Sequence, residues 1–218
     1  MTMPVKICGM QTKETIEAAL ASGASLIGFI FFEKSPRNVS PEEAGRLRRE
    51  IGDRASVVAV TVNADDAFLD RIVDRVKPDF LQLHGGETPE RVREVRARYG
   101  LPVIKVFSIR NASDIEAIQA WRGVADRFLL DAKAPAGSEL PGGNGVSFDW
   151  SLLRALDGDI EYMLSGGLNA GNIRAAIEAT GARAIDISSG VESAPGVKDS
   201  AMISRFFEKV AAASQPAV

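Results

Sequence analysis

The sequence predicts an α/β protein, a single-domain (β/α)8 TIM barrel spanning residues 1–218, and three observations support this. Eight short apolar or β-branched runs alternate with eight segments in which apolar residues recur at helical spacing. The apolar runs are nearly continuous, as in parallel strands that are covered on both faces. The 218 residues hold these eight units without a long insertion, which favours a closed barrel over an open doubly wound sheet.

Each expected strand is a run of β-branched and other apolar residues. In chain order, the runs are 5–8 (VKIC), 25–31 (SLIGFIF), 56–62 (SVVAVTV), 79–84 (DFLQLH), 102–107 (PVIKVF), 127–132 (RFLLDA), 161–165 (EYMLS) and 182–188 (ARAIDIS).

The expected helices begin with residues that are typical of helix entry. Thr12 is placed to cap the first helix, and Ser-Pro, Thr-Pro and Asn starts precede others. The predicted helical segments are 12–22, 40–51, 66–76, 88–99, 111–121, 148–156, 169–180 and 199–213. Residues 214–218 are expected to fray, because chain ends are poorly ordered unless they are tied down.

Composition excludes several classes of function. The formal net charge is −3 and the charges are interspersed, so the clustered basic face of a nucleic-acid-binding protein is missing. No apolar run is long enough to cross a membrane, and the first residues lack a signal-peptide layout, so a cytoplasmic location without a membrane partner is expected. The single cysteine cannot form an internal disulfide, and no Cys/His cluster suggests a metal site. Nothing in the sequence indicates an obligate protein partner.

Two glycine-containing segments follow the seventh and eighth expected strands. In barrel enzymes this is where phosphate groups are often bound, because glycine lets main-chain N–H groups approach an anion. The candidate phosphate-binding residues are Gly166, Gly167, Ser188, Ser189 and Gly190. Such a site needs no lysine, and none is adjacent in the sequence. The alternative is that both segments are tight turns that require a positive φ.

Cys8 and Asp131 end the first and sixth expected strands, so a barrel would place them at one rim. A thiol and a carboxyl group facing each other there would suit an isomerisation in which one proton leaves carbon and another reaches oxygen. Each also has a structural alternative. Cys8 could be a small buried apolar residue, and Asp131 could cap its loop or pair with Lys133.

Seven motifs resemble those of the phosphoribosylanthranilate isomerase family and follow that family's order along nearly the whole chain. They are KICGM (6–10), GFIFFEKSPRNVSPEEA (28–44), LQLHG (81–85), LLDAK (129–133), FDW (148–150), LSGGLNAGNI (164–173) and DISSGVE (186–192). The resemblance implies an Amadori rearrangement of N-(5-phosphoribosyl)anthranilate in tryptophan biosynthesis, with a phosphorylated small-molecule substrate and no metal or cofactor.

The resemblance also implies a role for individual residues. Cys8 matches the family's general base and Asp131 its general acid. Arg37 matches the arginine that holds the anthranilate group, and Asp186 the aspartate near the sugar and phosphate. His84, the only histidine, is expected at the rim, either contacting substrate or serving a structural role.

The chain departs from the family pattern in two places. Thr61 stands where an aromatic residue is common, which is expected to alter packing around the anthranilate ring, and Asn144 stands where Thr or Ser is usual. The glycine-rich segment 137–145 is expected to form a mobile lid that excludes water.

Two other functions would also use a barrel of this kind. One is the related aldose–ketose isomerase of histidine biosynthesis, which resembles this chain in fold but has aspartate at the end of the first strand and a half-barrel repeat. The other is a non-catalytic barrel that binds a phosphorylated ligand.

Overall fold

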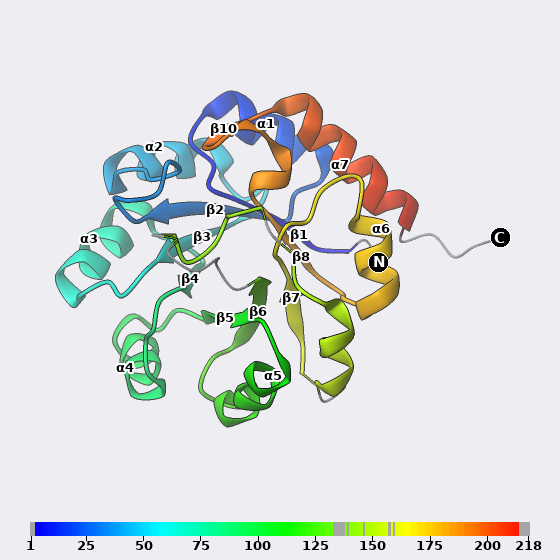
Figure 1. Ribbon diagram of the computed structural model, residues 1–218. Coiled ribbons are helices and arrows are strands. Elements are labelled where there is room, and N and C mark those ends of the chain that lie inside the picture. Colours follow the sequence, from blue (N-terminus) through cyan, green and yellow to red (C-terminus); the bar gives the residue numbers. More distant parts are fainter. Residues whose placement is uncertain are drawn as a thin grey trace.

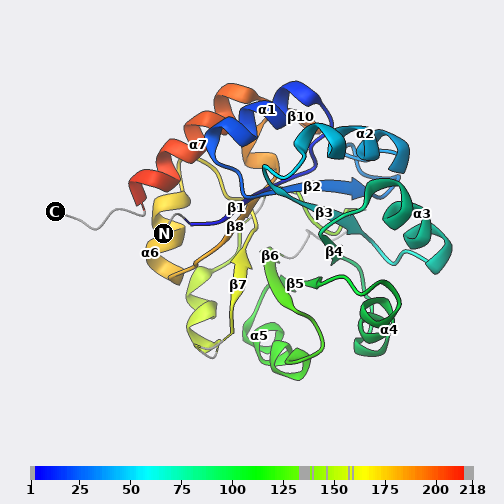
Figure 2. The same ribbon diagram turned by 180° about the vertical axis from the view of Figure 1, so that it is seen from behind.

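The computed structural model of the protein describes residues 3–132, 138, 140–145, 147–156, 158 and 160–213. Within these residues eight parallel strands pair in sequence order, and β1 also pairs with β8, which closes the barrel. Figures 1 and 2 show the strands at the centre with the helices around them. The predicted closed barrel is therefore confirmed, and the open sheet is excluded.

The barrel strands lie within or close to the expected runs. Their bounds are β1 Val5–Cys8, β2 Leu26–Phe31, β3 Ser56–Thr61, β4 Phe80–Leu83, β5 Val103–Ile109, β6 Arg127–Ala132, β7 Tyr162–Leu164 and β8 Ile185–Ile187. Alternate side chains of each strand point into the barrel, where residues such as Leu26, Val58, Ile104, Leu129 and Met163 form a buried apolar cluster. Burying each such side chain contributes roughly 1.5–3 kcal/mol.

The helices cover the outside of the barrel. They are α1 Lys13–Ser22, α2 Pro41–Ile51, α3 Asp66–Val76, α4 Pro89–Tyr99, α5 Ala112–Ile118, α6 Ile173–Thr180 and α7 Ser200–Ala213. The predicted caps are present: the Thr12, Ser40 and Thr88 hydroxyls each accept a hydrogen bond from the main chain three residues later. None of the helices in the described ranges has the length and apolar character needed to cross a membrane.

Three predicted helices differ from the observed elements. The segment expected at 148–156 is a 3₁₀ helix, η2 Trp150–Ala155, which the Asp149 side chain caps by accepting from the Ser151 N–H. Helix α6 begins at Ile173 instead of 169, because Asn169 forms a turn by accepting from the Gly171 N–H at 2.8 Å. Helix α5 is likewise shorter than expected and continues as a 3₁₀ turn, η1 Gln119–Trp121.

A short hairpin after β8 was not expected. A 3₁₀ turn, η3 Ser189–Val191, leads into β9 Glu192–Ala194, which pairs antiparallel with β10 Val197–Lys198. This hairpin returns Lys198 to the end of β8, where its Nζ donates to the Ser188 carbonyl at 3.0 Å. The expected frayed segment 214–218 lies outside the described residues, as do residues 137 and 139 of the expected lid.

Candidate active site

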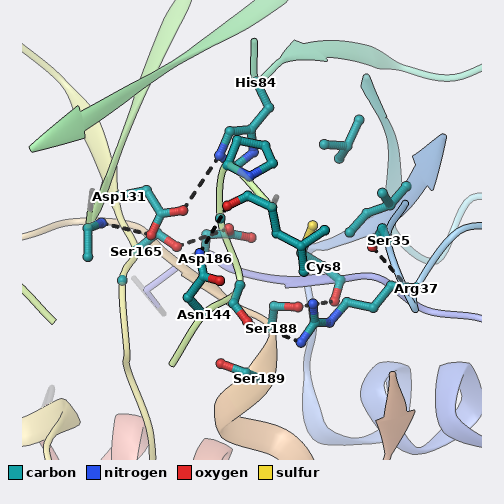
Figure 3. A pocket seen from close by; sticks show the side chains of 18 of the residues that line it. Cys8, Ser35, Arg37, His84, Asp131, Asn144, Ser165, Asp186, Ser188 and Ser189 are labelled. Atoms are coloured by element: carbon teal, nitrogen blue, oxygen red, sulfur yellow. Dashed lines mark hydrogen bonds and ion pairs between the residues drawn. The ribbon is translucent and has the colours of Figure 1, made fainter. Parts of the chain in front are cut away.

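A pocket opens at the carboxyl ends of the barrel strands (Figure 3). Nine of the predicted site residues line it: Cys8, Arg37, His84, Asp131, Gly166, Gly167, Asp186, Ser188 and Ser189. Gly190 is not in its lining. Figure 3 shows Asp131 and Ser165 on one side of the pocket, with Cys8 and Arg37 on the other. The barrel thus brings together groups that are distant in the sequence.

Asp131 is the penultimate residue of strand β6 and is buried beneath the pocket opening, with 6% of its surface exposed. Its Oδ1 accepts from the Ala132 N–H at 2.8 Å. Burial and then the negative charge of Asp186 raise the pKa of Asp131 to about 7. The carboxyl group therefore retains its proton up to near-neutral pH and can donate it.

His84 follows β4 and faces the acid. Its Nε2 lies 3.6 Å from Asp131 Oδ2 and has no hydrogen-bond partner among the described residues. Burial lowers the pKa of His84 to about 4, so the imidazole is neutral at physiological pH. The neutral ring places no positive charge beside Asp131, and its Nε2 can form a hydrogen bond with a ligand.

Cys8 ends β1 and lines the pocket with 5% of its surface exposed. Burial raises the pKa of the thiol, while the ammonium group of Lys6 acts in the opposite direction. The Cys8 carbonyl accepts from Ser188 Oγ at 3.1 Å, which ties the ends of β1 and β8 together. The thiol is thus held in a fixed place at the pocket wall.

Asp186 projects from β8 toward the pocket and is held by two contacts. Its Oδ1 accepts from Lys6 Nζ at 2.8 Å, and its Oδ2 accepts from Ser165 Oγ at 3.3 Å. Both partners are buried. Asp186 therefore combines a pocket-lining position with a structural anchoring of the barrel interior.

Arg37 reaches the pocket from the loop after β2, but an internal carboxylate already binds part of its guanidinium group. Its Nε and one terminal nitrogen donate to the two carboxylate oxygens of Glu192 at 2.7 and 2.8 Å. Although burial by itself raises the pKa of Glu192, its contacts with Arg37 and Lys198 bring that pKa below its usual range. Glu192 therefore stays ionised and fixes the plane of the guanidinium. Among the described residues Nη1 has no hydrogen-bond partner, so it can contact a ligand.

The two glycine-containing loops pack tightly against their neighbours. Gly166 has φ +89°, and a Cβ there would stand 2.6 Å from the Ala132 nitrogen. A Cβ on Gly190 would stand 1.9 Å from the Leu168 carbonyl oxygen, so this glycine is required for the two loops to approach each other. The turn alternative thus holds in part: Gly166 and Gly190 also have steric reasons to be glycine.

Main-chain donors remain at the same loops. Within the described part of the chain, the N–H groups of Gly167 and Ser189 donate to no acceptor. The Gly167 carbonyl instead accepts from the side chains of Asn169 and Asn172, at 3.3 and 2.9 Å, which fixes this turn. Fixed, unpaired N–H groups at a pocket wall are what an anion would need.

Sequence reasoning missed several residues of this site. No lysine is adjacent to these loops in the sequence, but the hairpin places Lys198 Nζ 3.2 Å from Ser188 Oγ. Sequence reasoning also missed Gln82, which lines the pocket with a buried Oε1 that has no partner among the described residues. The LQLHG motif carried a usable signal, because Gln82 and His84 alternate in a strand and so point to the same side.

The expected effect of Thr61 is corrected by the strand alternation. Val60 lies in the cluster inside the barrel and lines the pocket with Val62, whereas Thr61 between them is buried on the opposite, helix-facing side. Thr61 therefore does not pack against a ligand in this pocket. Asn144, the second departure, does line the pocket and stabilises its own loop by donating to the Leu140 carbonyl at 3.2 Å.

The described part of the expected lid covers the acid. A Cβ on Gly142 would stand 2.6 Å from Asp131 Oδ2 and 2.8 Å from His84 Nε2. The Gly143 carbonyl accepts from Arg37 at 3.3 Å. This segment therefore lies directly over Asp131, His84 and Arg37. Among the described residues, no group of three or more His, Cys, Asp or Glu side chains is placed to hold a metal ion.

Fold and site together define the class of protein: a (β/α)8-barrel enzyme with the groups for acid–base chemistry in a single pocket. Residues 5–209 match the family model described as N-(5'phosphoribosyl)anthranilate (PRA) isomerase. The chain therefore belongs to this isomerase family.

Relatives and solved structures agree with this assignment. The chain is 64% identical over 214 residues to the N-(5'-phosphoribosyl)anthranilate isomerase of Brucella canis, covering 98% of this chain and 96% of the relative. The crystal structure of phosphoribosyl anthranilate isomerase from Thermotoga maritima superposes with a TM-score of 0.85 at 35% identity, covering 97% and 100%. A phosphoribosyl anthranilate isomerase in complex with reduced 1-(o-carboxyphenylamino)-1-deoxyribulose 5-phosphate has a TM-score of 0.82 at 33% identity, with the same coverage.

Proposed function

We propose that this protein converts N-(5'-phosphoribosyl)anthranilate to 1-(2-carboxyphenylamino)-1-deoxyribulose 5-phosphate, an isomerisation in tryptophan biosynthesis. The observation that carries the proposal is the placement of Cys8 and Asp131 on opposite sides of one pocket, with an Asp131 pKa of about 7. An acid that keeps its proton near neutral pH is suited to opening a sugar ring, and a group across from it can then act as base.

In the first step, the Asp131 carboxyl group protonates the furanose ring oxygen. The bond between this oxygen and C1 breaks as the anthranilate nitrogen lone pair forms a C1–N double bond, and Asp131 is left as a carboxylate. The buried position of Asp131 and its raised pKa support this role.

In the second step, the Cys8 thiolate takes the proton from C2. The electron pair of the broken C–H bond forms a C1–C2 double bond and neutralises the iminium, giving an enolamine. The enolamine then tautomerises to the ketone: the C2 hydroxyl loses its proton as the C2–O double bond forms, and C1 gains a proton. Return of a proton from the thiol to the Asp131 carboxylate completes the cycle.

The ends of the substrate fit the two sides of the pocket. The free N–H groups of Gly167 and Ser189, together with the Ser189 hydroxyl, bind the phosphate. The Arg37 Nη1 meets the anthranilate carboxylate while Glu192 holds the guanidinium plane. Gln82 and His84 each have a polar atom without a partner in the described part of the chain, and these atoms face the sugar between the two ends. The segment 140–145 covers the reacting centre and limits the access of water.

Turnover tests this proposal directly. The purified protein is mixed with N-(5'-phosphoribosyl)anthranilate, and the loss of the substrate's fluorescence is followed. The wild type is expected to consume it, and Cys8→Ser and Asp131→Asn are each expected to lower turnover by roughly 10²–10⁴. A protein that binds the substrate without consuming it would be the non-catalytic barrel. Near-normal turnover by either variant would remove that residue from the mechanism.

A further inference from the structure

Lys6 is a charged residue in the apolar interior of the barrel. It precedes Cys8 by two positions on β1, so both side chains point inward. Its side chain is fully buried, and its Nζ donates to Asp186 Oδ1 at 2.8 Å. An unpaired ammonium group in such a place would be strongly destabilising, so the ion pair with Asp186 is needed for the lysine to be there at all.

Gly28 on β2 provides the space for this ammonium group. A Cβ on Gly28 would stand 3.1 Å from the Cys8 Cα and 3.1 Å from both Cε and Nζ of Lys6. The end of the Lys6 side chain and the Cα of Cys8 therefore both lie next to the position that a Gly28 side chain would occupy. The positive charge lies on the Cys8 side of the barrel.

Asp186 extends the pair toward the acid. Its second oxygen, Oδ2, accepts from Ser165 Oγ at 3.3 Å, and Ser165 lines the same pocket as Asp131. Figure 3 shows Asp186 and Ser165 next to Asp131. The order across the barrel is thus thiol, ammonium, carboxylate, hydroxyl and carboxyl group.

We propose that Lys6 and Asp186 form an oriented ion pair that favours the thiolate form of Cys8 at one end and the protonated form of Asp131 at the other. This inference rests on the proposed roles of Cys8 as base and Asp131 as acid. No proton passes through the pair. Lys6 and Asp186 act as positioning residues whose charges determine which of the two reacting groups holds a proton.

The charges that face the two groups support this orientation. After burial, the strongest influence on the Cys8 pKa is the charge of Lys6, which lowers it and exceeds the opposing effect of Asp186. Lys198, from β10, also lowers it weakly. At Asp131 the order is reversed: after burial, Asp186 raises the pKa more than Lys6 lowers it. One neutral pair thus has opposite net effects at its two ends.

The decisive variant removes both charges at once. Lys6→Met/Asp186→Asn leaves no buried unpaired charge, so it is expected to fold. Cys8 is the only cysteine, so the ultraviolet absorbance of its thiolate, corrected with the same variant carrying Cys8→Ser, reports its pKa without any need for activity. The Asp131 pKa is followed by carbon NMR of labelled aspartate, assigned with Asp131→Asn.

The expected result is a pair of opposite shifts. In the double variant the Cys8 pKa rises and the Asp131 pKa falls, each by about one unit, a tenfold change in the protonation equilibrium. The matched control is Lys105→Met/Glu87→Gln. It removes another buried ion pair, between Lys105 on β5 and Glu87 in the loop after β4, whose Nζ and Oε2 atoms are 2.7 Å apart. It is expected to leave the Cys8 pKa within a few tenths of a unit of the wild-type value.

An unchanged or lowered Cys8 pKa in the double variant would overturn the inference, as would shifts of the same sign at both groups. Failure of the proposed function looks different. If the opposite shifts occur but Cys8→Ser retains normal turnover, the charge arrangement stands and Cys8 is not the base.

Discussion

His84 Nε2 lies 3.6 Å from Asp131 Oδ2, with the imidazole neutral and the carboxyl group still protonated near pH 7. Gly142 lies over both, and even a methyl group at this position would collide with them. The acid is thus enclosed by a neutral ring and by main chain, which explains why burial is the largest cause of its raised pKa, followed by the negative charge of Asp186.

The pH dependence of turnover should follow Asp131. Because Asp131 must carry its proton while Cys8 must have lost its own, kcat/KM is expected to rise with pH up to about 7 and then to level off, since further loss of the Asp131 proton offsets the gain in Cys8 thiolate. Initial rates measured across the neutral and alkaline range provide the check. A rate that continues to rise about tenfold per pH unit above pH 8 would show that Asp131 does not donate the proton.

Asp131→Asn should change the pH dependence of stability. The folded pKa of about 7 exceeds the ordinary value of 3.8, so the folded state holds a proton that the unfolded state has lost between these limits. The wild type therefore loses stability as pH rises from about 4 to 7, by on the order of 4 kcal/mol in total, while the variant does not. Urea unfolding of both proteins at several pH values measures the difference.

A surface aspartate supplies the control for that comparison. Asp149 caps η2, and its hydrogen bond with Ser151 lowers its pKa. The carboxylate of Asp149 therefore stabilises the wild type as pH rises, so Asp149→Asn should not gain stability relative to the wild type over this range. If Asp131→Asn behaves like Asp149→Asn, the carboxyl group at 131 is not held in its protonated form.

The lid segment can be tested with a single methyl group. Gly142→Ala should lower kcat at least tenfold, because the Cβ would displace either the segment or the two side chains beneath it. Gly86→Ala, also at the carboxyl ends of the strands but with open space at its Cβ position, is the matched control and should keep normal turnover. Equal activity of the two variants would show that the close packing over Asp131 is not needed for turnover.

Glu192→Gln tests whether the carboxylate positions Arg37. Loss of the charge should loosen the bidentate contact, in which Nε lies 2.7 Å from Oε1, and raise KM about tenfold with a smaller change in kcat. Glu178→Gln, which breaks a surface contact with Arg174, should leave both constants unchanged. An unchanged KM for Glu192→Gln would argue against a role of this pair in binding the anthranilate carboxylate.

The sequence was sufficient to predict the barrel, because helix caps and apolar periodicity are local signals. The same reasoning placed Cys8 and Asp131 correctly at the ends of β1 and β6. It did not find the pairing of Arg37 with Glu192, whose partners are separated by 155 positions. Contacts of this kind depend on how the closed barrel and its hairpin bring loops together, which no local pattern encodes.

One missed residue did carry a local signal. Lys6 interrupts the apolar run VKIC, and a charged residue inside a strand that is otherwise buried on both faces requires a partner. Its partner, Asp186, also interrupts an apolar run, but it lies 180 positions away. The need for a pair was therefore visible in the sequence, while its identity required the closure between β1 and β8.

The proposed chemistry requires that two side chains meet one sugar from opposite sides. A crystal structure with the reduced product analogue bound would test this most directly. We predict that Cys8 Sγ lies within contact distance of C2, that the Asp131 carboxyl group lies beside the oxygen derived from the furanose ring, and that the phosphate sits on the main chain at Gly167 and Ser189. An analogue bound with either Cys8 or Asp131 out of reach of the sugar would contradict it.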